Sequence, residues 1–131
     1  MNRRTTPEAD AQRAIVQALR FAMPRDAIVH HCANEVTEVG PRGQIRQSIL
    51  VGMGVHAGFA DLIVISGGRV LFLEVKSETG RLRKSQEVFR DTVCAQGFGW
   101  ALVRSVDDAL AALADNGFTS RVRSPARRVQ R

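Results

Sequence analysis

The sequence is poor in several residue types, and each scarcity excludes a class of protein. Its 131 residues include only two cysteines, Cys32 and Cys94, which cannot form a disulfide framework and match no zinc-ligand spacing. Six Phe, one Trp and no Tyr are too few for a single-strand binder built on base-stacking platforms. No apolar run approaches the roughly 20 residues of a membrane span, and the N-terminus lacks the apolar core of a signal peptide. We therefore expect an intracellular, cytoplasmic protein with reduced thiols and no membrane contact.

The composition that remains is that of an ordinary globular domain, with 44% hydrophobic and 24% charged residues. The formal net charge of +6 is unevenly distributed. Residues 119–131 contain five arginines and no acid, which leaves the first 118 residues close to neutral. We expect a folded domain over residues 1–118 and a basic, flexible tail over residues 119–131. Such a tail either binds a polyanion or only improves solubility.

Three segments have apolar residues at helical spacing and a capping residue in front: 7–22, 85–96 and 106–116. Thr5 or Thr6 can cap the first helix and Ser85 the second. The third begins with a capping-box pattern, Ser105 followed by Asp108. In the second helix, the inward-facing side chains are expected to be Val88, Phe89, Thr92 and Val93. Cys94, in the same helix, is interpreted as a core thiol.

Four segments are typical of strands: 27–31, 61–65, 70–76 and 99–104. Gly67-Gly68 predicts a two-residue hairpin turn between the second and the third. These two strands are apolar on both faces, so helices should cover both sides of the sheet. The stretch 32–60 has five glycines and uncertain structure, with weak strand signals around Ile45–Leu50. The order of elements predicts an α/β fold, a mixed central β-sheet flanked by helices.

Two acidic residues meet at the end of the expected hairpin. A Gly67-Gly68 turn pairs residue 66 with 69, 65 with 70 and, finally, Asp61 with Glu74. Facing carboxylates repel unless one is protonated or a cation lies between them. Lys76, two residues after Glu74, emerges on the same face. Together these groups predict a divalent cation site beside a phosphate; the alternative is an edge ion pair between Glu74 and Lys76 next to a turn residue.

The motif Gly58-Phe-Ala-Asp61 followed by Glu74-Val75-Lys76 resembles that of the PD-(D/E)XK nuclease superfamily and, within it, the VRR-Nuc family of small phage and repair nucleases. Ala60 stands where that family often has proline, a difference that removes no reactive group. The resemblance spans Glu8 to about Gly117 and includes Gln12, Asn34-Glu35, Gly80-Arg81, Gln86 and Val103-Arg104-Ser105. It implies a restriction-endonuclease-like core and a metal-dependent DNA endonuclease.

The resemblance also implies roles for the central residues. Asp61, Glu74 and the backbone carbonyl of Val75 would bind Mg²⁺, with Mn²⁺ as a substitute. Lys76 would orient or deprotonate the attacking water and offset the charge that develops on the phosphate.

Two polar residues further from the motif match the family as well. Glu8 would reach the metal through a bound water; alternatively it is the capping-box residue after Thr5. Gln86 would support Lys76 or a phosphate; alternatively it is an ordinary exposed helix residue.

Basic residues near the motif are candidates for contacts with the DNA backbone, although charged residues often form only a solvated face. These candidates are Arg42, Arg46, Arg81, Arg83 and Lys84. Arg81, Arg83 and Lys84 precede a helix N-terminus, where phosphate is favoured. The three histidines lack the i, i+4 spacing of a zinc-binding helix and are interpreted as strand and loop residues: His30, His31 and His56.

Small phage-type members of the family imply a preference for branched DNA such as four-way (Holliday) junctions. Two symmetric cuts in a junction require two sites, which a homodimer supplies most simply. The alternatives are a flap, nick or less selective DNA nuclease, and a non-catalytic DNA-binding module of the same fold. A binding module would not need two repelling carboxylates, which favours the enzyme.

Overall fold

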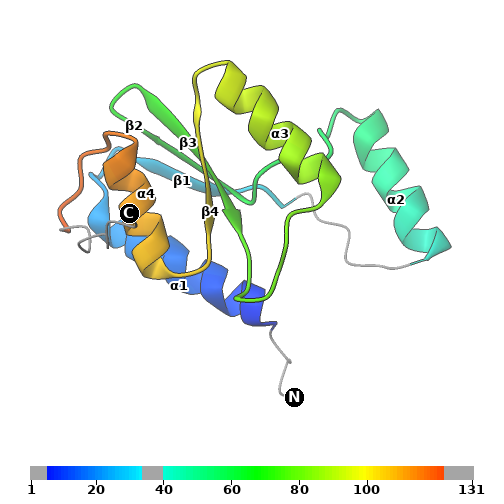
Figure 1. Cartoon of the computed structure of the whole chain (residues 1–131), viewed down its shortest axis with the longest axis horizontal. Helices are drawn as coiled ribbons and strands as arrows, with labels where there is room; N and C mark the ends of the chain where they lie inside the picture. The colour runs from blue at the N-terminus through cyan, green and yellow to red at the C-terminus, as the bar shows by residue number, and fades with distance from the viewer. Residues whose placement is uncertain (1–5, 34–39, 123–131) are drawn as a thin grey trace, which may run out of the picture.

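The computed structural model describes residues 6–33 and 40–122, which form four helices and one four-stranded sheet (Figure 1). The helices are α1 (Pro7–Ala22), α2 (Pro41–Gly52), α3 (Lys84–Ala95) and α4 (Val106–Asp115). The strands are β1 (Ile28–His31), β2 (Leu62–Ser66), β3 (Arg69–Val75) and β4 (Gly99–Val103). The expected α/β fold, a mixed sheet flanked by helices, is confirmed.

The sheet has the strand order β1-β2-β3-β4. β1 and β2 pair antiparallel, as do β2 and β3, whereas β3 and β4 run parallel. The expected hairpin register is confirmed from the pair Ser66–Arg69 to the pair Leu62–Leu73. Gly67 and Gly68 both have positive φ angles, 58° and 76°, which a two-residue turn with the twist of the flanking strands requires.

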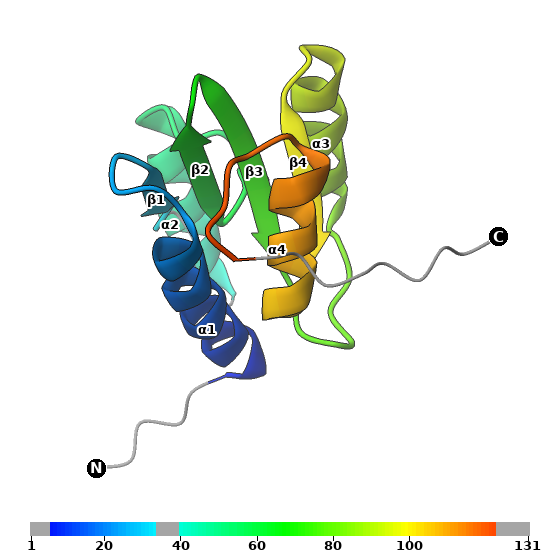
Figure 2. The same ribbon diagram turned by 90° about the vertical axis from the view of Figure 1, so that its left-hand side faces the viewer.

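Helices cover the two faces of the sheet unequally. α1 and α4 pack side by side on one face (Figure 2), where Leu19 and Leu113 meet the even-numbered β2 residues Leu62 and Val64. α3 packs on the opposite face, where its Phe89 belongs to a smaller cluster. Because side chains alternate along a strand, Glu74 in β3 belongs to the α3 face.

The N-caps of α1 and α4 are residues that the sequence suggests for this role. Thr6 caps α1, its Oγ1 accepting from the N–H of Ala9 at 3.1 Å. Ser105 caps α4, its Oγ accepting from the N–H of Asp108 at 3.1 Å. The second bond of the expected capping box is shifted by one residue. Asp108 Oδ2 accepts from the N–H of Arg104 at 2.9 Å instead of from the N–H of Ser105.

The weak strand signal at Ile45–Leu50 is wrong, because these residues lie in α2. The β-branched isoleucines suggested a strand, but Ile45, Ile49 and Met53 recur every four residues, a spacing that a helix places on one side. Pro41 suits the first helical position, since it has no N–H to leave unsatisfied. Only Gly43 of α2 is buried, so the helix adds almost nothing to the core.

Two expectations for α3 are also wrong. The N-cap is Arg83 rather than Ser85, because the helix begins at Lys84. Phe89 and Val93 are its only buried residues, whereas Val88, Thr92 and Cys94 are exposed. A single helix covering one edge of the sheet buries a narrow stripe at i, i+4 spacing, and the other three side chains lie outside that stripe.

Several expectations concern residues at the limits of the described structure. Phe118 belongs to the core, and the N–H of Arg121 donates to the carbonyl of Ala22 at 2.7 Å. Residues 123–131, which carry most of the basic tail, lie outside the described residues, as does the Asn34-Glu35 pair. The domain boundary at 118 and the role of the tail therefore stay predictions. Within 6–33 and 40–122, no helix combines the length and apolar character needed to cross a membrane.

Candidate active site

A cavity of about 650 Å³ lies between α2 and the ends of β2 and β3. Figure 1 shows α2 standing to one side of the sheet, so that it forms the outer wall. Five of the side chains proposed from sequence line this cavity, although they come from four separate parts of the chain: Glu8, Asp61, Lys76, Arg83 and Gln86. The fold thus brings distant candidates into one space.

Asp61 is held at the inner wall of the cavity by both its backbone and its side chain. Its Oδ2 accepts from the N–H of Val75 at 2.7 Å, across the hairpin. Its carbonyl accepts from the N–H of Cys32 at 2.8 Å. Asp61 precedes β2, so the last paired residues of the β2–β3 ladder are Leu62 and Leu73. The Asp61 carboxylate therefore bonds to the backbone of Val75, the residue that follows Glu74.

Glu74 shares one of its oxygens with two neighbours. Gln86 Nε2 donates to Glu74 Oε1 at 2.8 Å, and Lys76 Nζ lies 3.7 Å from the same oxygen. Gln86 therefore supports the Glu74 carboxylate, a partner that the sequence did not suggest, and its support of Lys76 or of a phosphate stays a prediction. The close approach of Lys76 confirms that its side chain emerges on the face of Glu74.

Asp61, Glu74 and Lys76 are the only buried polar or charged residues within the described ranges, with exposures of 3%, 1% and 7%. Removing charges from water costs several kcal/mol per ion, so buried charges are rare unless paired or functional. Two carboxyl groups and one lysine amine are thus gathered beside an open cavity. Carboxylate oxygens are ligands that Mg²⁺ prefers, and the carbonyl of Val75 could add a third. The donor set therefore fits a hard divalent cation.

Glu8 lines the same cavity from the first turn of α1. Because Thr6 is the N-cap, Glu8 is the second helical residue and not the third, so it does not occupy the capping-box position. Among the residues that the structure describes, no three His, Cys, Asp or Glu side chains gather closely enough to hold a metal. A direct ligand set of Glu8, Asp61 and Glu74 is therefore not assembled in this structure.

Comparison with solved structures finds a protein with a similar fold. A solved structure described as "VRR_NUC domain protein" matches with a TM-score of 0.63 and 18% sequence identity, covering 87% of this chain and 90% of its own. The chain has the fold of a VRR_NUC domain. No family model matches the sequence, and no curated protein matches it.

In this VRR_NUC fold the 54–60 loop, which leads into Asp61, passes against the start of α3 at Gly58. Gly58 has φ +76°, and a Cβ at that position would lie 2.1 Å from the carbonyl oxygen of Ser85. Only glycine allows this approach. The same contact therefore positions Asp61 and, through the first turn of α3, Gln86.

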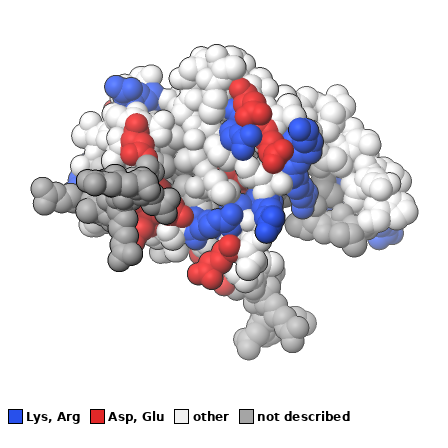
Figure 3. Space-filling model, in the orientation of Figure 1, with Lys and Arg blue, Asp and Glu red and all other residues white. Residues whose placement is uncertain are grey.

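The basic candidates divide into two groups. All five are exposed, and Arg83 is the one that lines the cavity; the others, which do not line it, are Arg42, Arg46, Arg81 and Lys84. Figure 3 shows basic side chains gathered over the start of α3 and the loop before it. A phosphate near the Arg83 side of the cavity would also face the N-terminus of α3, where it is favoured.

Several polar residues of the cavity are not among the site candidates expected from sequence. Gln44, Gln47 and Ser48 line the cavity from α2, and His56 lines it from the following loop. The three α2 residues follow one another at i, i+3 and i+4, and this helical spacing was the available signal. It was overlooked because the segment was not recognised as a helix.

Cys32 lies next to the site without lining it. Burial raises the pKa of its thiol, and the negative charge of Asp61 raises that pKa further. The thiol therefore stays protonated at neutral pH and is a poor nucleophile. His30 and His31 lie on β1 and His56 in a loop, as expected.

Proposed function

We propose that this protein is a metal-dependent DNA endonuclease that hydrolyses phosphodiester bonds. The observation that carries the proposal is the burial of Asp61, Glu74 and Lys76 in a VRR_NUC fold, with Asp61 and Lys76 at the wall of an open cavity and Glu74 behind them, bonded to the cavity residue Gln86. A hydrophobic cluster in the same place would cost less free energy. Retaining three charges there is best explained by chemistry that uses them.

The metal in this proposal is Mg²⁺, with Mn²⁺ as a substitute, bound by Asp61, Glu74 and the Val75 carbonyl. When bound, such an ion lowers the pKa of a coordinated water and neutralises charge on the phosphate oxygens. The ligands are oriented beforehand, because Asp61 bonds to the Val75 N–H and Glu74 to Gln86. Glu8 would accept a hydrogen bond from water on the metal.

Lys76 has two tasks in the proposed reaction. Its ammonium, 3.7 Å from Glu74 Oε1, can turn to orient the attacking water. It can also donate to a non-bridging phosphate oxygen as negative charge accumulates there. Arg83 at the cavity wall would hold the adjacent phosphate, with Arg81 and Lys84 further along the backbone and Arg42 and Arg46 on α2.

We further propose that the enzyme acts as a homodimer on branched DNA such as four-way junctions. The support is the outer side of α2, where Ile45, Ile49 and Met53 are 61%, 56% and 80% exposed. These residues and Pro41 recur every four positions along α2 and its C-cap, and are here called the α2 stripe. An apolar stripe on a helix that buries almost nothing in its own chain suits a two-fold interface.

Cleavage assays test this function. Four-way junction, flap, nicked and linear duplex DNA are incubated with the protein in Mg²⁺, Mn²⁺, Ca²⁺ or chelator. Mg²⁺ and Mn²⁺ should support cleavage, most rapidly of the junction, and Asp61→Asn and Glu74→Gln should abolish it. The exposed Asp107→Asn in α4 is the matched control and should cleave normally. Junction binding without cleavage in any metal would indicate a DNA-binding module instead, and faster cutting of flaps or nicks would refute the junction preference.

A further inference from the structure

Arg104, the first residue after β4, forms hydrogen bonds to the loop between β3 and α3, which is distant from it in the sequence. Its Nη1 donates to the backbone carbonyls of Glu78 at 3.2 Å and Gly80 at 2.8 Å, and also to the carbonyl of Ser77. These carbonyls belong to the loop that connects β3 with α3. One guanidinium nitrogen therefore gathers three carbonyls of this loop, of which the Ser77 carbonyl also accepts from the N–H of Gly80 at 3.2 Å.

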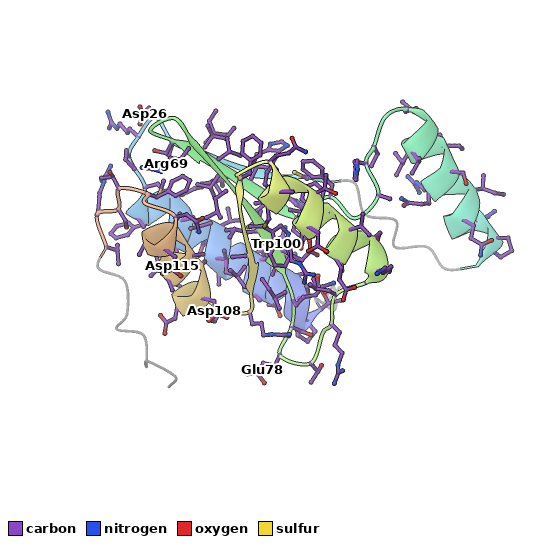
Figure 4. All side chains as sticks on the ribbon, turned by 45° about the horizontal axis from the view of Figure 1, so that its top comes forward. Asp26, Arg69, Glu78, Trp100, Asp108 and Asp115 are labelled. Atoms are coloured by element: carbon purple, nitrogen blue, oxygen red, sulfur yellow. The ribbon has the colours of Figure 1, made fainter. Side chains whose placement is uncertain are left out.

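The backbone of Arg104 is itself held firmly. Its N–H donates to Asp108 Oδ2 in the first turn of α4. The residue before it, Val103, accepts from the N–H of Lys76 at 3.1 Å and so ties β4 to the end of β3. Figure 4 shows Glu78, in the loop, and Asp108, at the start of α4, at the same end of the molecule. Arg104 thus connects a rigid helix start to the loop.

The clamped loop lies directly against Lys76. A Cβ built on Gly80 would lie 3.4 Å from both Cβ and Cδ of Lys76, and 3.2 Å from Ser77 Oγ. The backbone at Gly80 therefore covers the aliphatic part of the Lys76 side chain. This cover helps to explain how a lysine only 7% exposed keeps its ammonium directed at Glu74.

We propose that Arg104 is a positioning residue for the active site: by fixing residues 77–80 against the stem of Lys76, it sets the place of the Lys76 ammonium. The inference rests on the proposed nuclease function. Arg104 does not line the cavity, so its effect passes through the loop. All three bonds start at Nη1, whose positive charge strengthens hydrogen bonds to carbonyl oxygens, while the planar guanidinium fixes the direction of its donors.

Arg104→Gln and Arg104→Lys test the proposal, with the exposed Arg20→Gln in α1 as a control of equal charge. Single-turnover cleavage and DNA binding in Ca²⁺ are measured for each variant. Arg104→Gln should lower the cleavage rate at saturating DNA about 10- to 100-fold, the scale expected for a displaced catalytic group. Its DNA affinity should stay within about 3-fold of the parent. Arg104→Lys should recover part of the rate, and Arg20→Gln should match the parent.

Two results would overturn the proposal: an unchanged rate in Arg104→Gln, or a loss confined to DNA affinity, which would make Arg104 a DNA contact. If Arg104→Gln does not fold, Gly80→Ala tests the same loop from the other side. Its added methyl presses on Lys76 and should lower the rate with little change in the melting temperature; an unchanged rate would count against the proposal.

Hydrogen exchange separates a failure of this proposal from a failure of the proposed function. If the parent cleaves no DNA, the nuclease assignment fails, but the clamp is still testable. Exchange of the backbone amides of residues 77–80 should then accelerate in Arg104→Gln and not in Arg20→Gln. Equal exchange in the parent and Arg104→Gln would refute the clamp itself.

Discussion

The side-chain amide of Gln86 bonds to Glu74 through its nitrogen and to the N-cap residue of α3, Arg83, through its oxygen. Its Nε2 donates to Glu74 Oε1 at 2.8 Å, while its Oε1 accepts from the N–H of Arg83, also at 2.8 Å. Both amide atoms are therefore used, and the orientation of the side chain is determined by its neighbours. Through this residue, the start of a helix and a buried carboxylate hold each other in place.

Replacing Gln86 should consequently affect stability and charge balance together. Gln86→Ala removes both bonds and should lower the free energy of unfolding by about 1–3 kcal/mol. Gln86→Glu places a carboxylate against Glu74 and should be more destabilising at pH 7 without divalent cations. Repulsion raises the folded-state pKa of the new carboxyl, so its destabilising effect should diminish as the pH falls and the group protonates. Urea unfolding between pH 5 and 8 measures this, and the exposed Gln17→Glu should show no such trend.

Divalent cations should stabilise the folded protein in proportion to their binding. Because the cation binds Asp61 and Glu74 in the folded state only, saturating Mg²⁺ at 100 times its dissociation constant should add about 2.7 kcal/mol. Asp61→Asn should fold, because the amide oxygen of Asn can still accept from the N–H of Val75, but should lose most of this gain. Thermal unfolding with and without Mg²⁺ measures the effect, with Asp107→Asn as control. An equal shift in Asp61→Asn would contradict the metal assignment.

Gly58→Ala should damage the site through packing and backbone strain together. The new Cβ would meet the Ser85 carbonyl at 2.1 Å in a residue with φ +76°, so the loop or the start of α3 must move. We expect a loss of about 3 kcal/mol or more in unfolding free energy and loss of cleavage. Gly68→Ala is the control, because Gly68 has the same φ but nothing within 4 Å. Its cost should be about 1–2 kcal/mol, and equal costs would refute the close contact.

The α2 stripe should determine the oligomeric state. Ile45→Asp with Ile49→Asp should convert the dimer to a monomer, since desolvating these charges would oppose association. The fold should persist, because both residues are exposed. Sedimentation at micromolar concentration measures the mass. Val51→Asp, also exposed but on another side of α2, should remain dimeric; a monomeric parent protein would refute the proposed dimer.

Much of the fold was predictable because it depends on neighbouring residues. The Gly67-Gly68 turn determined the register of β2 and β3, and thereby placed Asp61, Glu74 and Lys76 at one end of the hairpin. α1 and α4 were recognisable from their periodicity and caps. In each case the stabilising contacts lie within a few positions along the chain, so the pattern is complete in the local sequence.

Other features depended on contacts between distant segments, and only the tertiary structure decided them. α2 was not recognised because it contributes little to the core, so its pattern could not be checked against a buried face. Gln44 and Gln47 line the same cavity as Asp61 and Lys76 only because the chain returns past them at Asp61. The bonds from Gln86 to Glu74 and from Arg104 to the Ser77–Gly80 loop join residues 12 and 24 to 27 positions apart. Many polar side chains could make such bonds, and the packing of α3 and α4 on the sheet determines which of them meet.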